Sequence, residues 1–174
     1  RICINSILHA ATNKHEVVII DDASTNAQTI DFLGRCGKSE YQNITILKNL
    51  ENSGVSYSLN KGIASANGDY IAPVDHDDSV MPSGFEVAMK HILYFNSQWV
   101  YTNELQVDTK GYLIRSLHKP VYSKQLLRSI MYINHLQIFS KSLVESIGGY
   151  RDGLEGSQDH DLALRMTELH DPLH

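Results

Sequence analysis

The stretch Glu16-Val17-Val18-Ile19-Ile20-Asp21-Asp22 joins a short aliphatic run to a pair of acidic residues. A continuous run of β-branched residues between helix-like segments is typical of a strand that is buried on both faces in a parallel sheet. The segment Asn43-Ile44-Thr45-Ile46-Leu47 repeats this pattern. These two segments predict an α/β fold with a mainly parallel central sheet flanked by helices.

The rest of the chain continues the alternation of strands and helices. Further strands are expected at 70–74, 99–101 and 136–139. Helices are expected at about 4–11, 28–34, 55–66, 83–93, 141–147 and 161–169. Ser53 is the expected N-cap of the third helix and Gly68 its stop, while Ser83 and Glu86 form a capping box. In such folds ligands bind at the carboxyl ends of the strands.

Composition limits the classes of function. The 174 residues are 42% apolar and 20% charged, with a formal net charge of −5, which does not favour binding to nucleic acid phosphates. The longest aliphatic run, Val17 to Ile20, is too short to span a bilayer. Two cysteines, Cys3 and Cys36, match no metal-binding spacing and are interpreted as reduced thiols of a cytosolic-type protein.

Three acidic clusters lie at the ends of the expected elements. The first, Asp21-Asp22, follows the opening strand and is either a turn or cap, or a carboxylate that faces a ligand. The third, Gln158-Asp159-His160-Asp161, leads into a helix. Negative charge is favourable at a helix N-terminus, but one of these two aspartates could instead act as a general base. The spacing alone leaves both alternatives open.

The second cluster, Asp75-His76-Asp77-Asp78, is the most informative. Three carboxylates within four residues repel one another unless a positive group neutralises them. Divalent cations prefer oxygen ligands and often retain substrate phosphates. A metal–diphosphate site is therefore favoured over a capped turn, with His76 as a spacer. His135 stands alone before an apolar run, where a histidine is more often structural than part of a site.

Four segments, in order, resemble family 2 glycosyltransferases, which have the GT-A fold. Residues 16–25 resemble the first nucleotide-binding motif, and 52–63 the helix that follows it. Residues 68–82 resemble the DxD segment, and 148–165 the acceptor-side motif that carries the catalytic base. The resemblance implies one GT-A catalytic domain over residues 1–174, without the family's first strand and C-terminal flank.

The resemblance also implies an activity and a set of site residues. The activity is inverting transfer of a sugar from a nucleotide-sugar, UDP-linked in most members, to a hydroxyl. The implied roles are nucleobase binding for Asp22, ribose or donor-sugar binding for Asp75, coordination of Mn or Mg for Asp77, a place near donor and acceptor for His135, and general base for Asp159. Gln158 stands where the family commonly has Glu.

The implied partners are a nucleotide-sugar donor and a saccharide or lipid-linked acceptor of polysaccharide biosynthesis. The expected location is the cytoplasm, or the inner face of a membrane reached through segments outside these residues. A nucleotide-binding but inactive fragment and a nucleotide-sugar pyrophosphorylase are the alternatives, although the motif at 158–165 argues against the second. A receiver-type signalling module would be shorter and would not need the second acidic cluster.

Overall fold

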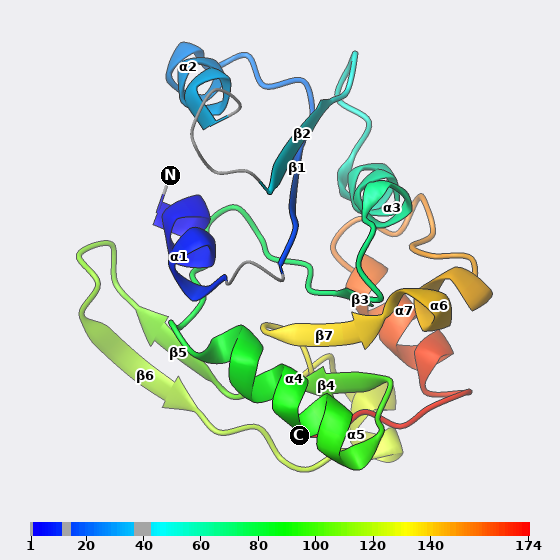
Figure 1. Cartoon of the computed structure of the whole chain (residues 1–174). Helices are drawn as coiled ribbons and strands as arrows, with labels where there is room; N and C mark the ends of the chain where they lie inside the picture. Colours follow the sequence, from blue (N-terminus) through cyan, green and yellow to red (C-terminus); the bar gives the residue numbers. More distant parts are fainter. Residues whose placement is uncertain (1, 12–14, 37–42) are drawn as a thin grey trace.

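A computed structural model of the chain describes residues 2–11, 15–36 and 43–174 (Figure 1). The described helices are α1 Ile2–Ala10, α2 Ala27–Cys36, α3 Val55–Ser65, α4 Gly84–Phe95, α5 Lys124–Ser129, α6 Lys141–Ser146 and α7 Gln158–Met166. The described strands are β1 Val17–Asp21, β2 Ile44–Lys48, β3 Tyr70–Ile71, β4 Trp99–Tyr101, β5 Glu104–Val107, β6 Leu113–Leu117 and β7 Gln137–Ser140.

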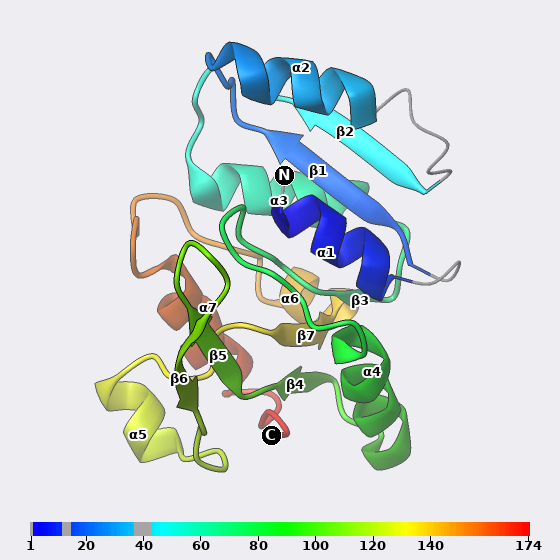
Figure 2. The same ribbon diagram turned by 90° about the vertical axis from the view of Figure 1, so that its left-hand side faces the viewer.

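The first two predicted strands form a parallel pair. β1 lies beside β2 with Val17 opposite Ile44 and Asp21 opposite Lys48, and α2 and α3 flank the pair (Figure 2). α3 packs closely on β1, because a side chain at Gly62 would stand 3.5 Å from Cγ1 of Ile20. Asp21 and Asp22 therefore lie at the carboxyl end of a parallel strand, as the sequence predicts, although Val17 to Ile20 are only partly buried rather than buried on both faces.

The second sheet has the order β3-β7-β4. β7 runs antiparallel to both neighbours, so β3 and β4 point in the same direction on either side of it. The α/β class is confirmed, and the antiparallel β7 is an addition to the expected parallel arrangement. A short apolar run shows that a strand is buried on both faces but does not show its direction.

The core occupies both faces of the second sheet. Trp99 and Tyr101 of β4 belong to one apolar cluster with α7, while Val100 between them belongs to another with α4. Phe139 and Ile138 of β7 divide in the same way. Because successive side chains of a strand point to opposite faces, this sheet is buried between helices on both sides.

Three described elements, β5, β6 and α5, are absent from the sequence-based expectations. The β5–β6 hairpin pairs Glu104 with Leu117, and α5 follows it. Most residues of the hairpin strands are exposed, so they lack an alternation of apolar and polar residues that would mark a half-buried strand. α5 has only six residues, fewer than two helical turns, and so carries no usable periodicity.

Several expected helix caps are wrong. α3 begins after Gly54, not Ser53, because the Ser53 backbone N–H donates to Asp22 Oδ1 and its hydroxyl to the Glu51 carbonyl. α3 ends at Ser65 with Ala66 as its C-cap, before Gly68. Ser83 does precede α4, but its side chain makes no capping bond. No described helix is both long and apolar enough to cross a bilayer.

Candidate active site

The loop after β3 carries Asp75 and Asp78 and rests on α1. Cys3, a free thiol as predicted, donates from Sγ to the Asp75 carbonyl oxygen at 3.2 Å. The Val80 backbone N–H donates to Oγ of Ser6 at 3.0 Å. α1 therefore holds this loop at both ends of the acidic cluster, across more than 70 residues of sequence.

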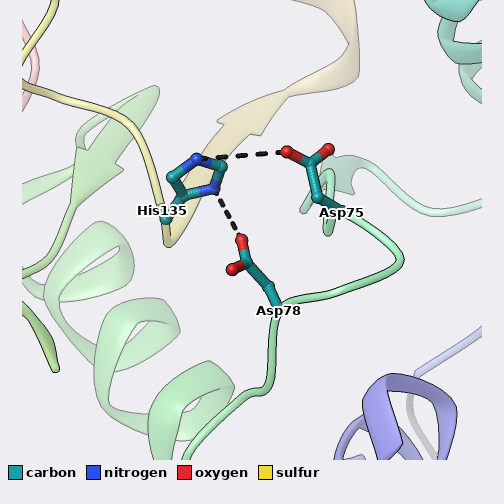
Figure 3. A group of neighbouring side chains, drawn as sticks. All are labelled: Asp75, Asp78 and His135. Carbon is teal, nitrogen blue, oxygen red and sulfur yellow. Dashed lines mark ion pairs between the residues drawn. The ribbon is translucent and has the colours of Figure 1, made fainter. Parts of the chain in front are cut away.

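His135 lies between the two aspartates of this loop (Figure 3). Its Nδ1 is 3.0 Å from Oδ2 of Asp78, and its Nε2 is 4.0 Å from Oδ2 of Asp75. One possible ligand atom from each of the three residues lies within 4.8 Å of the others. The histidine that stands alone in the sequence is thus part of a compact group, Asp75–Asp78–His135.

Negative charge accumulates around this group. The pKa of the Asp78 carboxyl is raised, chiefly by burial. The charge of His135 acts in the opposite direction, and the charges of Asp75, Asp77 and Glu104 add to the rise. A raised pKa means that the ionised form of Asp78 is disfavoured by its surroundings. A divalent cation would relieve this repulsion, so the electrostatics fit a cation rather than an anion.

The donor set also fits a hard divalent cation. Carboxylate oxygens are preferred ligands of Mg²⁺ and Mn²⁺, and an imidazole nitrogen suits first-row transition metals. A set of two carboxylates and one imidazole therefore accommodates Mn²⁺ more readily than Mg²⁺. The residues that could hold such an ion among the described part of the chain are Asp75, Asp78 and His135.

Asp77 takes a different position. Its side chain is 77% exposed, and its carboxylate lies 3.9 Å from Nδ1 of His76, which is itself almost fully exposed. The structure does not bring Asp77 into the Asp75–Asp78–His135 group. The assignment of Asp77 as the metal ligand therefore stays a prediction.

Asp159 joins Asp75 and His135 at a shared pocket. It lies in the first turn of α7, and a small pocket is lined by Leu59, Pro73, Asp75, Asn134, His135, Gln137 and Asp159. Burial, and then the charge of Asp75, raise the pKa of the Asp159 carboxyl. His135 and hydrogen bonds from Tyr150 and Gln158 oppose the rise. A carboxylate with a raised pKa in a pocket has the properties of a general base.

The other aspartate of the third cluster has a structural role. Asp161 accepts from Arg165 Nη2 at 2.6 Å and from Arg151 Nη1 at 3.2 Å, so it is a salt-bridge partner. With Asp159 as the base, the sequence leaves Asp161 as the acid that caps the helix, and the structure shows no such capping bond from its side chain. Arg165 also donates to the carbonyl oxygens of Ile147 and Gly149. The turn before α7 is therefore anchored to the helix that carries Asp159.

The same turn is clamped from the other side by α3. The Asn60 amide donates to the Tyr150 carbonyl and accepts from the Tyr150 N–H, each at 2.8 Å. A Cβ atom on Gly149 would stand 2.4 Å from Oδ1 of Asn60, and Gly149 has a φ of +69°. Only glycine satisfies both conditions, which gives Gly149 of the Gly148-Gly149 pair a physical reason.

Gly149→Ala is expected to lower the free energy of unfolding by about 3 kcal/mol or more, because it adds left-handed strain and displaces both Asn60 hydrogen bonds. Gly153 is the matched control, with φ +77° and open space around its Cβ position. Gly153→Ala should cost only the strain, about 1–2 kcal/mol. Urea unfolding measures both, and equal losses would contradict the clamp.

Asp22 lies apart from the Asp75–Asp78–His135 group, at the end of β1. Its carboxylate accepts from Asn49 Nδ2 at 2.7 Å, from the Ser53 N–H at 2.8 Å and from the Gly54 N–H at 2.9 Å. Burial opposes its ionisation, but these hydrogen bonds outweigh burial and hold its pKa below the ordinary value. The turn interpretation of the first cluster therefore has direct geometric support, and the nucleobase role of Asp22 stays a prediction.

Sequence reasoning placed Asp78 in the acidic cluster without giving it a role of its own, and it missed Asn134 as a member of the site. Asp78 is visible within the acidic cluster, but only its pairing with His135, 57 positions away, distinguishes it from Asp77. Asn134 lines the pocket beside His135 and carries no signal of its own in the sequence.

Comparison with known proteins identifies the family. Residues 1–147 match the family model described as Glycosyl transferase family 2. The chain belongs to glycosyl transferase family 2. The O-antigen biosynthesis protein RfbC of Myxococcus xanthus is 29% identical to this glycosyl transferase family 2 chain over 169 residues, 97% of this chain and 13% of RfbC.

Two solved structures confirm the GT-A fold of this family 2 chain. The crystal structure of S. aureus TarS 1-349 superposes with a TM-score of 0.75 at 18% identity, over 95% of this chain and 50% of that one. The mannosyltransferase PcManGT from Pyrobaculum calidifontis, in complex with GDP-Man and Mn²⁺, superposes with a TM-score of 0.72 at 18% identity, over 98% and 48%. The chain thus spans at most about half the length of these proteins.

Proposed function

We propose that this chain forms the catalytic part of an inverting glycosyltransferase that uses a nucleotide-sugar, UDP-linked, and a saccharide or lipid-linked hydroxyl. The observation that carries the proposal is the pocket in which Asp159, with its raised pKa, shares a wall with Asp75 and His135. Membership of glycosyl transferase family 2 supports a nucleotide-sugar donor. The name of the relative RfbC, an O-antigen biosynthesis protein, supports a saccharide acceptor.

The proposed reaction exchanges one bond for another at the anomeric carbon. The acceptor oxygen forms a bond to this carbon from the face opposite the nucleotide, and the bond from the carbon to the diphosphate oxygen breaks. Asp159 accepts the hydroxyl proton as the new bond forms. The nucleoside diphosphate leaves with the bonding electron pair. Asp159 lies in the partly buried first turn of α7, and the segment before this helix is anchored by Arg165 and Asn60, which limits movement of the backbone that carries Asp159.

A divalent cation, when bound, would supply a positive charge that stabilises the diphosphate as it departs. Asp75, His135 and a second carboxylate of the 75–78 loop would hold it. The geometry favours Asp78 as that carboxylate, while the resemblance favours Asp77. Mn²⁺ in the complex of PcManGT, a protein of the same fold, supports a cation of this kind.

Asp22 is the proposed contact to the nucleobase. It stands at the carboxyl end of β1, where ligands of parallel sheets bind. Its Oδ2 accepts one hydrogen bond, from Gly54, and so retains the capacity to accept another from a base N–H. The three existing hydrogen bonds would fix the carboxylate before the nucleotide arrives.

A thermal-shift panel tests the donor proposal. UDP, GDP and UDP-sugars are each added with and without MnCl₂. A uridine nucleotide with Mn²⁺ at 100 times its dissociation constant should stabilise the chain by about 2.7 kcal/mol, or roughly 5–10 °C in Tm. A response to GDP alone would replace the UDP assignment, and no response to any nucleotide would contradict the function.

A second measurement separates an enzyme from a fragment that only binds. Release of nucleoside diphosphate is followed with the stabilising nucleotide-sugar and a panel of saccharide and lipid-linked acceptors. Acceptor-dependent release is the expected result. Binding without such release would instead establish the nucleotide-binding but inactive alternative.

A further inference from the structure

Lys119 is a nearly buried cation behind the candidate active site. Its side chain is 7% exposed. Its ammonium group lies 3.2 Å from Oε2 of Glu104, donates to the His135 carbonyl oxygen at 2.7 Å, and donates to the Asn134 carbonyl oxygen. An ammonium group has three N–H donors, so these three acceptors satisfy it completely.

The position of Lys119 is itself fixed. It follows β6, and its backbone N–H donates to Oδ1 of Asn103 at 2.8 Å. Glu104 is the first residue of β5 and is paired with Leu117 of β6. The hairpin therefore brings the Glu104 carboxylate and the Lys119 ammonium group together next to the segment that carries His135.

His135 depends on tertiary contacts for its backbone conformation. Its φ is +34°, a region that residues other than glycine rarely adopt without support from their surroundings. On the following residue, the Leu136 N–H donates to Oγ1 of Thr102 and its carbonyl accepts from the Thr102 N–H, both at 3.1 Å. The carbonyl oxygens of Asn134 and His135 both accept from the Lys119 ammonium group.

We propose that Lys119, balanced by Glu104, is a positioning residue that holds the backbone of Asn134 and His135 so that the imidazole stands between Asp75 and Asp78. The cation-binding part of this proposal rests on the proposed function, whereas the placement of His135 does not. Without the ammonium, two carbonyl groups and the Glu104 carboxylate would lose their partner in a partly buried place. The His135 segment would then relax away from the Asp75–Asp78 pair.

The matched variants are Lys119→Met and Lys141→Met. Lys141 resembles Lys119 in its contacts, since its Nζ donates to the Ala66 carbonyl at 2.7 Å and lies 3.6 Å from Glu145. It differs in place, because it follows the last residue of β7, whereas His135 precedes the first. The double variant Lys119→Met with Glu104→Gln removes both members of the buried pair. Because it leaves no unpaired Glu104 carboxylate, this double variant can be measured even if Lys119→Met alone fails to fold.

Two measurements are made on each folded variant. The first is the ring signal of His135 in ¹H–¹³C NMR spectra of the metal-free chain, assigned with His135→Gln. The second is Mn²⁺ affinity by calorimetry. Lys119→Met and the double variant should move the His135 signal toward those of exposed histidines and weaken Mn²⁺ binding by about 10–100-fold, the usual effect of losing support behind a ligand. Lys141→Met should change neither.

The outcomes separate this proposal from the cation site. A His135 signal that moves in the Lys119 variants, in a chain that binds no Mn²⁺, supports the positioning role and contradicts the cation proposal. A His135 signal that is unchanged in folded Lys119→Met or in the double variant overturns the positioning role, whatever the metal affinity. A purely structural lysine would lower Tm without moving this one histidine.

Discussion

Asp159→Asn is expected to lower acceptor-dependent release of nucleoside diphosphate by about 10²–10⁴-fold, the usual contribution of a general base. The amide keeps the size of the side chain but cannot take the hydroxyl proton. Nucleotide binding, measured by thermal shift, should persist because no step of binding uses this proton transfer. A variant that retained wild-type turnover would show that another group is the base.

The same substitution should make the chain more stable. Burial and Asp75 raise the pKa of Asp159 in the folded chain above its ordinary value, about 3.9. When folding raises the pKa of a group, its favourable contribution to folding stability is complete below its pKa in the unfolded chain. That contribution is lost as pH rises through its pKa in the folded chain. At neutral pH the ionised carboxylate therefore opposes folding, and Asp159→Asn should raise Tm. The gain should disappear below about pH 3.9.

Asp161→Asn is the matched control on the same helix. Asp161 is bonded to Arg165 at 2.6 Å and 2.8 Å, so the amide should weaken this pair and lower Tm at neutral pH. Opposite signs for two aspartates two positions apart would separate a catalytic carboxylate from a structural one. A fall in Tm for Asp159→Asn would contradict the buried-charge explanation.

Asp78→Asn is expected to weaken Mn²⁺ binding by at least about 100-fold, since losing only an outer partner of a metal ligand already costs about 10–100-fold. Asp77→Asn, one position earlier, should leave the affinity close to that of the unmodified chain, because the Asp77 side chain is exposed and lies outside the group around His135. Calorimetry with MnCl₂ and the full chain measures both. The neighbouring residues make a closely matched pair.

The opposite order of losses would restore the assignment drawn from the DxD resemblance. It would also mean that the 75–78 loop rearranges when the cation binds, so that Asp77 replaces Asp78. Equal, small losses in both variants would place the cation away from this loop. His135→Gln gives a third comparison, since the imidazole belongs to the group whichever aspartate completes it.

The sequence predicted the buried elements better than the exposed ones. The apolar runs of β4 and β7 were recognisable because burial on both faces requires such residues. Those of β1 and β2 were recognisable by their β-branched residues, although these two strands are only partly buried. The β5–β6 hairpin was not, because its exposed strands satisfy no such requirement. Ser53 was misplaced as a cap because its N–H is taken by Asp22, a residue 31 positions earlier.

By itself the sequence determined the α/β class, the three acidic clusters at the ends of elements, and the resemblance to the family that the comparison then confirmed. These features depend on local periodicity and on residue types at short spacing. Only the tertiary structure decided that His135 meets Asp78, that Lys119 lies behind it and that Asp161 is a salt-bridge partner. Such pairings join distant segments, and which atoms meet depends on how the whole chain packs.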